Sequence, residues 1–263
     1  MSLPTRSRFR ARLARGAGDM RAVQRLRQLT FRGGALAGMD EDRFDDLCLH
    51  VLVEQAATGA LVCCFRILPL AGGAQITRSY SAQFYDLSAL VPFAGPIVEI
   101  GRFCIHPDWR DPDILRVAWA ELTAYVDTHG VTMLFGCSSF AGTDAARYLD
   151  AFAMLRDRHL APRRWGPRIK APLVYRYAQA VGRHKPDARA GLRGMPPLLR
   201  TYLGMGGWVS DHAVIDRQLN TLHVFTGVEI ATIPAARKRL LRASVQALKG
   251  SLNGALDGAR AAG

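Results

Sequence analysis

Residues 97–137 read IVEIGRFCIHPDWRDPDILRVAWAELTAYVDTHGVTMLFGC, and this stretch decides the fold. The apolar run Ile97–His106 predicts a strand, and Pro107, which has no N–H to donate to a sheet, closes it. Val131–Cys137 is a second short apolar run and predicts another strand. The two strands are too far apart for a hairpin, so the segment between them must cross over the sheet.

That segment predicts a helix over Asp113–His129. Pro112 precedes it in the position where a proline starts a helix, and Gly130 is a natural C-cap. Leu115, Ala118, Leu122 and Val126 recur at helical spacing and mark its buried side. A strand, a crossover helix and a strand predict a mixed sheet of the α/β (α+β) class.

The residues before this stretch predict a helix and a hairpin. Asp19–Phe31 has helical periodicity and ends at Gly33. Leu47–Glu54 and Ala60–Leu68 are strand-like runs on either side of a Thr-Gly turn, which is typical of antiparallel strands. Downstream, Thr143 is expected to cap a further helix that turns three apolar side chains inward, Tyr148, Phe152 and Leu155.

These patterns divide the chain into four parts. A basic N-terminal arm covers 1–17, a core covers 18–162, a basic Pro/Gly-rich loop covers 163–195, and a C-terminal extension covers 196–263. The extension contains a strand-like run, Leu222–Ile230, and an amphipathic tail. In the tail, positive charges accompany four apolar residues at helical spacing, Leu241, Val245, Leu248 and Leu252. The same pattern also fits a helix that packs on its own domain.

The formal net charge of +13 favours anionic partners. Arginines gather in the arm, between Arg6 and Arg15, and again between Arg156 and Arg200. No zinc-finger, RNA-recognition or basic-zipper signature accompanies them, so nucleic acid is not the expected partner. An acidic protein or an anionic membrane surface fits the two clusters better.

The cysteines and histidines do not predict a metal site. The five cysteines contain no C-x-x-C pair, and the histidines are scattered. Cysteines in apolar runs are typical of buried thiols in a reducing compartment. No window of about 18 apolar residues occurs, and the basic N-terminus lacks an apolar signal region. We therefore expect a cytoplasmic protein that can associate peripherally with the inner face of the membrane.

Charged and aromatic residues then recur in a specific order along the core. Arg27 and Phe31 lie four apart, two acids follow, an Arg-Ile-Leu-Pro run ends the second strand, and Glu-x-x-Arg-Phe lies in the next one. This set resembles the acyl-homoserine-lactone synthases and, more closely, the ornithine lipid synthases (L-ornithine N-alpha-acyltransferases). The resemblance covers residues 19–152, and residues 196–216 resemble the C-terminal part of the ornithine lipid synthases and of the related hemolysin-like acyltransferases.

The resemblance implies a GNAT-like mixed, split sheet flanked by helices, opening between the strand of Glu99 and the strand that starts at Val131. The backbone exposed there would pair with the amides of a phosphopantetheine arm, as an added strand does. Glu99 is the implied catalytic base, working through water, and the N–H groups of Phe103 and Cys104 would face the thioester oxygen. The implied substrate-binding residues are Arg27, Phe31, Asp42, Asp45, Arg66 and Arg102.

The residues themselves also allow other roles. Glu99 can instead form an ion pair that stabilises the sheet. Asp42 and Asp45 can hold the acceptor's ammonium groups, position Arg27 and Arg66, or line a solvated edge. Glu99 and Arg102 lie three apart, so a regular pleat turns them to opposite faces of the sheet.

The segment His106–Pro112 points to the acyl donor. A GNAT enzyme that uses CoA places a Gly-rich turn here, whose N–H groups cradle pyrophosphate at a helix N-terminus. This segment has no glycine, two prolines and two carboxylates. The expected donor is therefore an acyl carrier protein, which is acidic and brings its own phosphopantetheine, so no separate cofactor is expected. An atypical CoA loop is the alternative.

Together these features predict transfer of a 3-hydroxyacyl chain from acyl carrier protein to the α-amine of L-ornithine, giving lyso-ornithine lipid. The same chemistry on glycine or glutamine, homoserine-lactone synthesis and CoA-dependent N-acetyl transfer are the enzymatic alternatives. From another class, the basic clusters and the tail would suit a membrane-interaction protein without catalysis.

Overall fold

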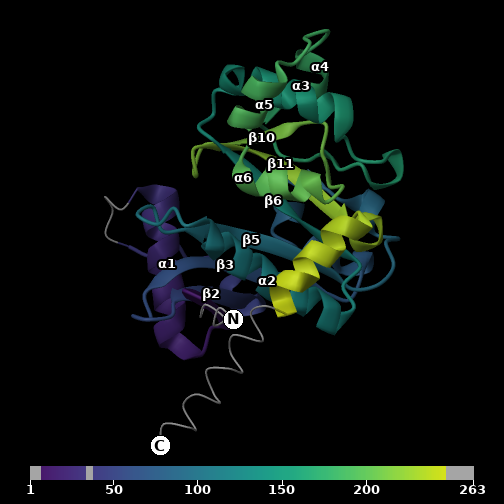
Figure 1. Ribbon diagram of the computed structural model, residues 1–263. Coiled ribbons are helices and arrows are strands. Elements are labelled where there is room, and N and C mark those ends of the chain that lie inside the picture. Colours follow the sequence, from purple (N-terminus) through teal and green to yellow (C-terminus); the bar gives the residue numbers. More distant parts are fainter. Residues whose placement is uncertain (1–6, 34–37, 247–263) are drawn as a thin grey trace, which may run out of the picture. The chain divides into compact units, whose positions relative to one another are not determined.

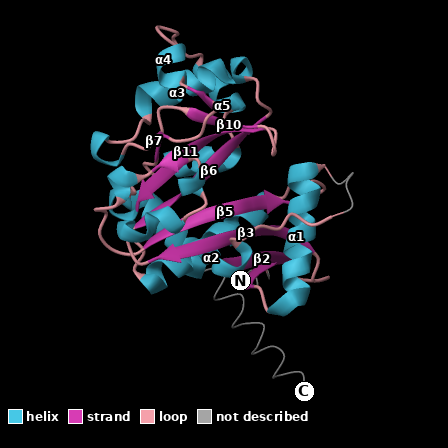
Figure 2. Ribbon diagram, turned by 180° about the vertical axis from the view of Figure 1, so that it is seen from behind, coloured by secondary structure: helices cyan, strands magenta, loops and turns pink. Residues whose placement is uncertain are grey.

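A computed structural model of the protein describes residues 7–33 and 38–246 (Figure 1). Its backbone contacts divide the chain into two compact units. Unit 1 comprises residues 1–67, 102–130 and 235–263, and unit 2 comprises residues 68–101 and 131–234. Each unit contains strands with helices packed on them, which Figure 2 distinguishes by colour.

In unit 1 the strand order is β1 (Phe9–Leu13), β2 (Leu49–Gln55), β3 (Leu61–Leu70) and β5 (Ile97–Ile105). Only the part of β5 from Arg102 onward belongs to this unit. β2 and β3 form an antiparallel hairpin with a register shift at Val53/Glu54. The predicted hairpin is therefore confirmed, within two residues at each end.

Strand β1 shows that part of the predicted basic N-terminal arm belongs to the sheet. Phe9 is buried while Arg10 and Arg12 point away, and both guanidinium groups bind Glu54 on β2, at 3.0 and 2.5 Å. Arg12 also pairs with Asp19 in the first helix. Arginines alternating with apolar residues thus build an edge strand, because its neighbour supplies the counter-charge.

Two helices complete the described core of unit 1. α1 (Gly16–Arg32) begins three residues before the predicted start and ends at Gly33, whose φ of +71° suits glycine. Its buried Val23 and Leu26 pack with three side chains of the sheet, Leu52, Cys64 and Cys104. α2 (Pro112–His129) has the predicted proline at its start and ends at Gly130, whose φ is +60°. α2 contacts β1 and β2.

Unit 2 contains the paired ends of the two strands that the predicted crossover helix joins, while the helix itself, α2, belongs to unit 1. Ile97–Glu99 of β5 pair in parallel with the start of β6 (Met133–Ala141), and β6 pairs antiparallel with β11 (Thr221–Glu229). The sheet continues with β10 (Ala213–Asp216) and β8 (Val174–Tyr175), and β9 (Trp208–Val209) also pairs with β11. One parallel pair among antiparallel ones makes the sheet mixed.

The parallel ladder between β5 and β6 is short. It consists of three residue pairs and ends at Glu99↔Phe135. β6 continues as far as Ala141, and its last six residues pair with β11. Two local features accompany this end. A side chain at Gly136 would collide with the carbonyl oxygen of Ile100, and Arg102 has a φ of +51°, which interrupts the pleat of β5.

One face of the β6–β11 pair packs against helices. Phe140, Leu222 and Val224 form a core with α3 (Leu149–Arg158), α4 (Tyr177–Ala180) and α6 (Pro197–Gly204). The helix predicted after Thr143 starts instead with a 3₁₀ turn, η5 (Ala145–Tyr148). The capping oxygen belongs to Asp144, which accepts a hydrogen bond from the Ala146 N–H. Phe152 and Leu155 are buried, as predicted.

The other face is covered by the chain between β3 and β5. This segment contains η2 (Gly73–Arg78), η3 (Ser81–Gln83), β4 (Tyr85–Asp86) and η4 (Ser88–Leu90). Tyr85 is buried against Phe225 and His223 of β11, and its hydroxyl donates to the His223 carbonyl at 2.8 Å. Burial lowers the pKa of His223 to about 4, so this imidazole is neutral.

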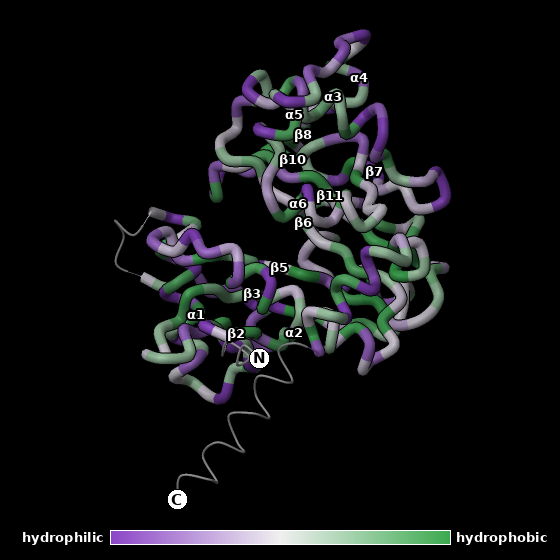
Figure 3. The backbone as a smooth tube through the Cα atoms, in the orientation of Figure 1, coloured by the Kyte–Doolittle hydropathy of each residue, from purple (hydrophilic) through white to green (hydrophobic). Residues whose placement is uncertain are grey.

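The stretch 163–195, predicted to be loop, has short regular elements. They are η6 (Arg163–Trp165), β7 (Arg168–Ile169), β8, α4 and α5 (Ala188–Gly194). β7 pairs with β4 and β8 pairs with β10, so both strands depend on partners distant in sequence. The residues between α4 and α5 are largely hydrophilic, whereas those at the start of β6 are hydrophobic (Figure 3).

The C-terminal extension begins with α6, and the predicted strand-like run Leu222–Ile230 coincides with β11 to within one residue at each end. After η7 (Ile230–Thr232) residues 235–246 are helical, and Arg242 pairs with Asp127 of α2 at 2.9 Å. Leu241 and Val245 are half-buried, while Leu248 and Leu252 lie outside the described residues. Across residues 7–33 and 38–246, no helix has the length and apolar character needed to cross a bilayer.

Candidate active site

Three arginines and three aspartates of unit 1 form a closed ring in which positive and negative groups alternate. Each of these arginines contacts two of the three aspartates, and each aspartate contacts two of the three arginines, with closest N–O distances from 2.6 to 3.1 Å. In order around the ring, the members are Arg27, Asp45, Arg66, Asp42, Arg102 and Asp40. We call these six residues the charge ring. It brings together five of the six residues expected to bind substrate.

The ring is assembled from separate elements. Arg27 lies on α1, Arg66 on β3 and Arg102 at the irregular point of β5. The 3₁₀ turn η1 (Asp45–Leu47) presents Asp45, whose Oδ1 accepts from both Arg27 and Arg66. Asp42 Oδ1 also accepts from the Phe44 N–H, which fixes the acidic segment just before β2. Elements distant in sequence are therefore tied together at one point.

The charge ring is largely buried, and the pairing outweighs the cost of burial. Burial by itself would raise the pKa of Asp45, but hydrogen bonds and charges from Arg27, Gln24 and Arg66 hold that pKa below its ordinary value. The pKa of Asp42 is lowered in the same way, against burial, chiefly by Arg66. Burial opposes the charge of Arg27 too, yet Asp45 and Asp40 raise its pKa above the ordinary value. All three groups are ionised at neutral pH.

Asp40 belongs to the ring but was missed in the sequence. Its side chain is 2% exposed, and its Oδ2 accepts from the Nε atoms of Arg27 and Arg102, at 2.8 and 2.9 Å. A signal was present, because three candidate arginines faced only two candidate aspartates, and a buried site requires a third negative charge. The acidic run Asp40-Glu41-Asp42 was the place to look for it.

The most accessible members of the ring are Asp42 and Arg102, whose side chains are 20% and 12% exposed. The Arg102 guanidinium lies 5.9 Å from the centre of the Phe31 ring, which places the sixth expected substrate-binding residue beside it. A molecule that approaches the charge ring from solvent would contact Asp42 and Arg102 before the buried members.

Phe103 and Cys104 follow Arg102 on β5. The Phe103 ring stacks on Phe65 of β3, with centroids 5.1 Å apart. Cys104 is buried, and its sulfur lies 3.5 Å from the sulfur of Cys64. These contacts fix the side chains of both residues, so the N–H groups of this part of the strand are held in place.

Glu99, on the unit 2 part of β5, is buried, and its carboxylate accepts hydrogen bonds from Tyr80 and Ser81. The N–H of Tyr80 donates to Oε2 at 2.7 Å, and the N–H and hydroxyl of Ser81 donate to Oε1 at 2.7 and 2.5 Å. Ser81 Oγ also lies 3.4 Å from the sulfur of Cys137. The carboxylate therefore fastens the start of η3 to β5, a contact that the sequence did not indicate.

The expectation from the pleat does not apply to Glu99 and Arg102. It assumed a regular strand between them, whereas the left-handed conformation of Arg102 breaks the alternation of side chains. The direction of Arg102 is set by Asp40 and Asp42 instead.

The segment His106–Pro112 turns tightly into α2. The Trp109 N–H donates to the His106 carbonyl at 2.9 Å, and the indole of Trp109 packs edge-on against Phe9. Asp111 caps the helix, because its Oδ1 accepts from the Asp113 N–H at 2.9 Å, and Pro112 has no N–H. The N-terminus of α2 is thus occupied by the protein's own carboxylate.

Comparison with known proteins places the chain in a family. Residues 26–120 match the model of the acetyltransferase (GNAT) domain. The chain is 36% identical to the L-ornithine N(alpha)-acyltransferase of Rhodobacter capsulatus over 230 residues, which are 82% of this chain and 88% of that protein. The chain belongs to the L-ornithine N(alpha)-acyltransferase family. The acyltransferase class and the GNAT-like fold predicted from the sequence are confirmed.

A second member, the L-ornithine N(alpha)-acyltransferase of Brucella abortus, is 29% identical over 239 residues, 84% of each chain. An acyl-homoserine-lactone synthase of Agrobacterium fabrum matches over a shorter region, with 27% identity over 40% of this chain and 53% of its own. Among solved structures, FeeM, an N-acyl amino acid synthase from uncultured soil microbes, has a TM-score of 0.48 and 10% identity, covering 85% of this chain and 92% of its own. The described residues contain no group of three metal-binding side chains.

Proposed function

We propose that this member of the L-ornithine N(alpha)-acyltransferase family transfers a 3-hydroxyacyl chain from acyl carrier protein to the α-amine of L-ornithine. The product is lyso-ornithine lipid, and the reaction is the first step toward an ornithine lipid. The observation that carries the acceptor is the 36% identity to the Rhodobacter capsulatus enzyme over most of both chains.

The start of α2 supports the choice of donor. A CoA thioester carries a pyrophosphate that GNAT enzymes bind with free N–H groups at this helix. Here Asp111 already uses one of these groups and Pro112 offers none. The exposed carboxylate of Asp108 would repel phosphate, whereas the charge of Asp111 is paired with Arg8. A donor without a nucleotide avoids this position, so an acyl carrier protein fits better than CoA.

We propose that Glu99, through a water molecule, takes the proton that the acceptor's ammonium group must lose. The neutral amine then attacks the thioester carbon, a C–N bond forms, and the negative charge on the oxygen faces the N–H groups of Phe103 and Cys104. Collapse of this intermediate breaks the C–S bond, and the carrier's thiol leaves with a proton. A general base contributes about 10²–10⁴-fold, and an oxyanion donor about 3 kcal/mol.

The charge ring supports recognition of an amino acid in this scheme. Ornithine carries two ammonium groups and one carboxylate, and the accessible members of the ring offer both signs, Asp42 as an acceptor and Arg102 as a donor. The buried members hold these two side chains in place. Glycine and glutamine lack the second ammonium group, so with either of them Asp42 would have no ammonium group of the acceptor to bind.

The donor specificity gives a direct test. The purified protein, supplied with L-ornithine, should use 3-hydroxyacyl carrier protein at least about tenfold more efficiently, in kcat/KM, than the matching acyl-CoA. Mass spectrometry of the product should give the mass of N-acylated ornithine, and glycine and glutamine serve as control acceptors. Rising salt should reduce the rate with the carrier protein, because it screens attraction between unlike charged surfaces. Equal efficiency with both donors would contradict the proposed donor.

We further propose that the tail attaches the protein peripherally to an anionic membrane, where a lyso-lipid is best released. The described beginning of the tail carries positive charge at Arg237, Lys238 and Arg239, and Leu240 is 59% exposed. Vesicle flotation should show the full chain on anionic but not neutral vesicles, and a chain ending at Pro234 should stay unbound. Equal binding of both chains would exclude the tail as the anchor, and the basic stretch 163–200 would then be the next candidate.

A further inference from the structure

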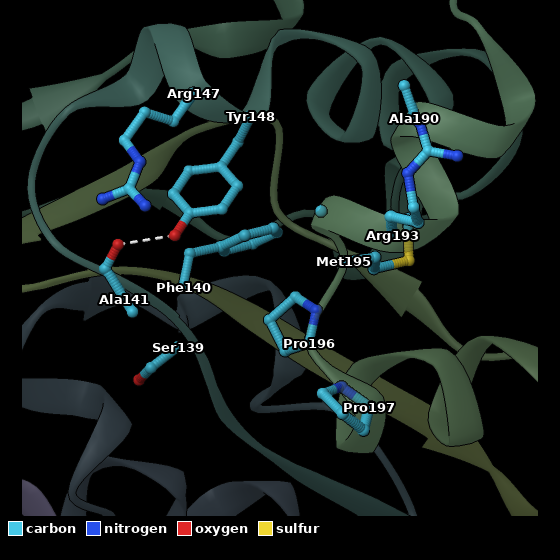
Figure 4. Close-up of a pocket in the computed structure, with 11 residues that line it drawn as sticks. Ser139, Phe140, Ala141, Arg147, Tyr148, Ala190, Arg193, Met195, Pro196 and Pro197 are labelled. Carbon is cyan, nitrogen blue, oxygen red and sulfur yellow. Dashed lines mark hydrogen bonds between the residues drawn. The ribbon is translucent and has the colours of Figure 1, made fainter.

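Unit 2 contains a surface cavity of about 620 Å³ at the far end of β6, away from Glu99. The last residues of β6, Ser139–Ala141, form its floor, and residues of η5, of α5 and of the segment that follows α5 form its wall. In Figure 4, Arg147 and Tyr148 lie on one side of the cavity, and Arg193 and Met195 lie across from them. This volume lies within the range of small-molecule sites.

The two arginines differ from those of the charge ring in having no counter-ion. In the part of the chain that the structure describes, neither Arg147 nor Arg193 forms an ion pair with a carboxylate. The Arg147 guanidinium lies 5.9 Å from the centre of the Tyr148 ring, and the Tyr148 hydroxyl donates to the Ala141 carbonyl at 2.6 Å. The cavity therefore presents two positive groups that are open to an anion from solvent.

The position along β6 suggests which anion this is. β6 pairs with β11 along one edge as far as Ala141, while on its other edge the parallel pairs with β5 end at Phe135, six residues earlier. In the proposed reaction the prosthetic arm of the carrier lies along this edge, with its sulfur near the point where pairing ends. The arm has about thirteen bonds from sulfur to phosphorus, the length of a little more than four residues of extended chain.

Four residues beyond Gly136 is Phe140, which lies in the floor of the cavity. An extended arm that starts at the end of the ladder thus brings its phosphate between Arg147 and Arg193. Planar guanidinium groups match the geometry of phosphate oxygens, and the aromatic and proline residues of the wall suit the dimethyl carbon of pantoic acid beside the phosphate.

We propose that Arg147 and Arg193 form the binding site for the phosphate of the donor's phosphopantetheine arm. This inference rests on the proposed function, since it assumes a donor whose phosphate lies at the end of a pantetheine chain. The site's two arginines are not among the residues at the start of α2, where CoA-dependent GNAT enzymes bind pyrophosphate. It explains how the enzyme recognises phosphate although that helix start is blocked by Asp111.

The test uses the full chain and two small probes, 4′-phosphopantetheine and pantetheine, which differ only in the phosphate. Calorimetry should show that the unaltered protein binds the phosphorylated probe at least about tenfold more tightly. In the double variant Arg147→Gln/Arg193→Gln this preference should vanish, with the affinity for pantetheine unchanged. The control is Arg189→Gln/Arg200→Gln, which removes the same charge from exposed positions near the cavity and should keep the preference.

Other results would overturn the inference. Equal binding of the two probes by the unaltered protein, or a preference that survives in the Arg147/Arg193 variant, excludes a phosphate site at this cavity. If the KM for acyl carrier protein rises in that variant while the preference for phosphopantetheine persists, the arginines bind the carrier's acidic surface instead. The binding measurement needs no turnover. The preference for 4′-phosphopantetheine can therefore be confirmed or excluded even if the protein does not acylate ornithine. The proposed function and the phosphate site are thus tested separately.

Discussion

Replacing Glu99 with glutamine should lower kcat with acyl carrier protein and ornithine by about two orders of magnitude or more. The variant keeps the size of the side chain but cannot accept a proton. If the missing step is deprotonation of the acceptor, the rate should recover as the pH rises, because more of the amine is then already neutral. The pH profile of kcat/KM for Glu99→Gln beside the unaltered protein is the measurement.

The structure makes a control necessary for this variant. Glutamine replaces one carboxylate oxygen with an NH₂ group, which would face an N–H donor of Tyr80 or Ser81 and lose a hydrogen bond, at a cost of about 1–3 kcal/mol in stability. Ser81→Ala also removes one hydrogen bond to Glu99 but leaves the carboxylate in place. The Ser81→Ala variant should lose some stability, but its loss of activity should be much smaller than that of Glu99→Gln. Normal turnover of Glu99→Gln at neutral pH, or equal losses in both variants without recovery at high pH, would show that Glu99 is not the base.

Replacing Arg27 with methionine should lower the free energy of unfolding by about 3–5 kcal/mol, because it leaves two buried carboxylates without one of their partners. Arg27 is 1% exposed and contacts Asp40 and Asp45, which are nearly as deeply buried. For a protein of this size the loss corresponds to a fall in melting temperature of about 10 °C. Thermal unfolding followed by circular dichroism measures it.

Arg116→Met is the matched control for this experiment. Arg116 pairs with Asp113 on the surface of α2, where both side chains are about 40% exposed. Surface pairs contribute less than about 1 kcal/mol, so this variant should melt close to the unaltered protein. An Arg27→Met protein that melts like Arg116→Met would mean that the charge ring does not hold α1 to the strands.

The hairpin, the crossover helix and the long strands were predictable because their evidence is local. Apolar runs, a proline at the start of α2 and glycines after α1 and α2 act within a few residues of their own position. β1 was not predictable in this way. Its arginines resembled a solvated arm, and only Glu54, more than forty residues later, makes them part of a sheet.

The candidate site was predictable as a set of residues but not as an arrangement. The order of arginines and aspartates indicated which residues belong together. It did not indicate that they neutralise one another in a ring, nor that Asp40 completes it. The left-handed conformation of Arg102 is a further feature without a local signal, because such a φ is unusual for arginine and is sustained by contacts with Asp40 and Asp42. The hydrogen bonds from Tyr80 and Ser81 to Glu99 likewise join segments that are distant in the sequence.

The five thiols lie at different depths, and this makes them reporters of motion. Cys48 and Cys137 are partly exposed, whereas Cys63, Cys64 and Cys104 are buried. The neighbouring Cys104 and burial raise the pKa of Cys64, and burial raises that of Cys63, so neither is a ready nucleophile in the closed state. A thiol reagent can reach Cys104 only after β5 has separated from its neighbours. The labelling rate of Cys104 therefore times the local opening of the strand on which the acyl transfer is proposed to occur, without any attached probe.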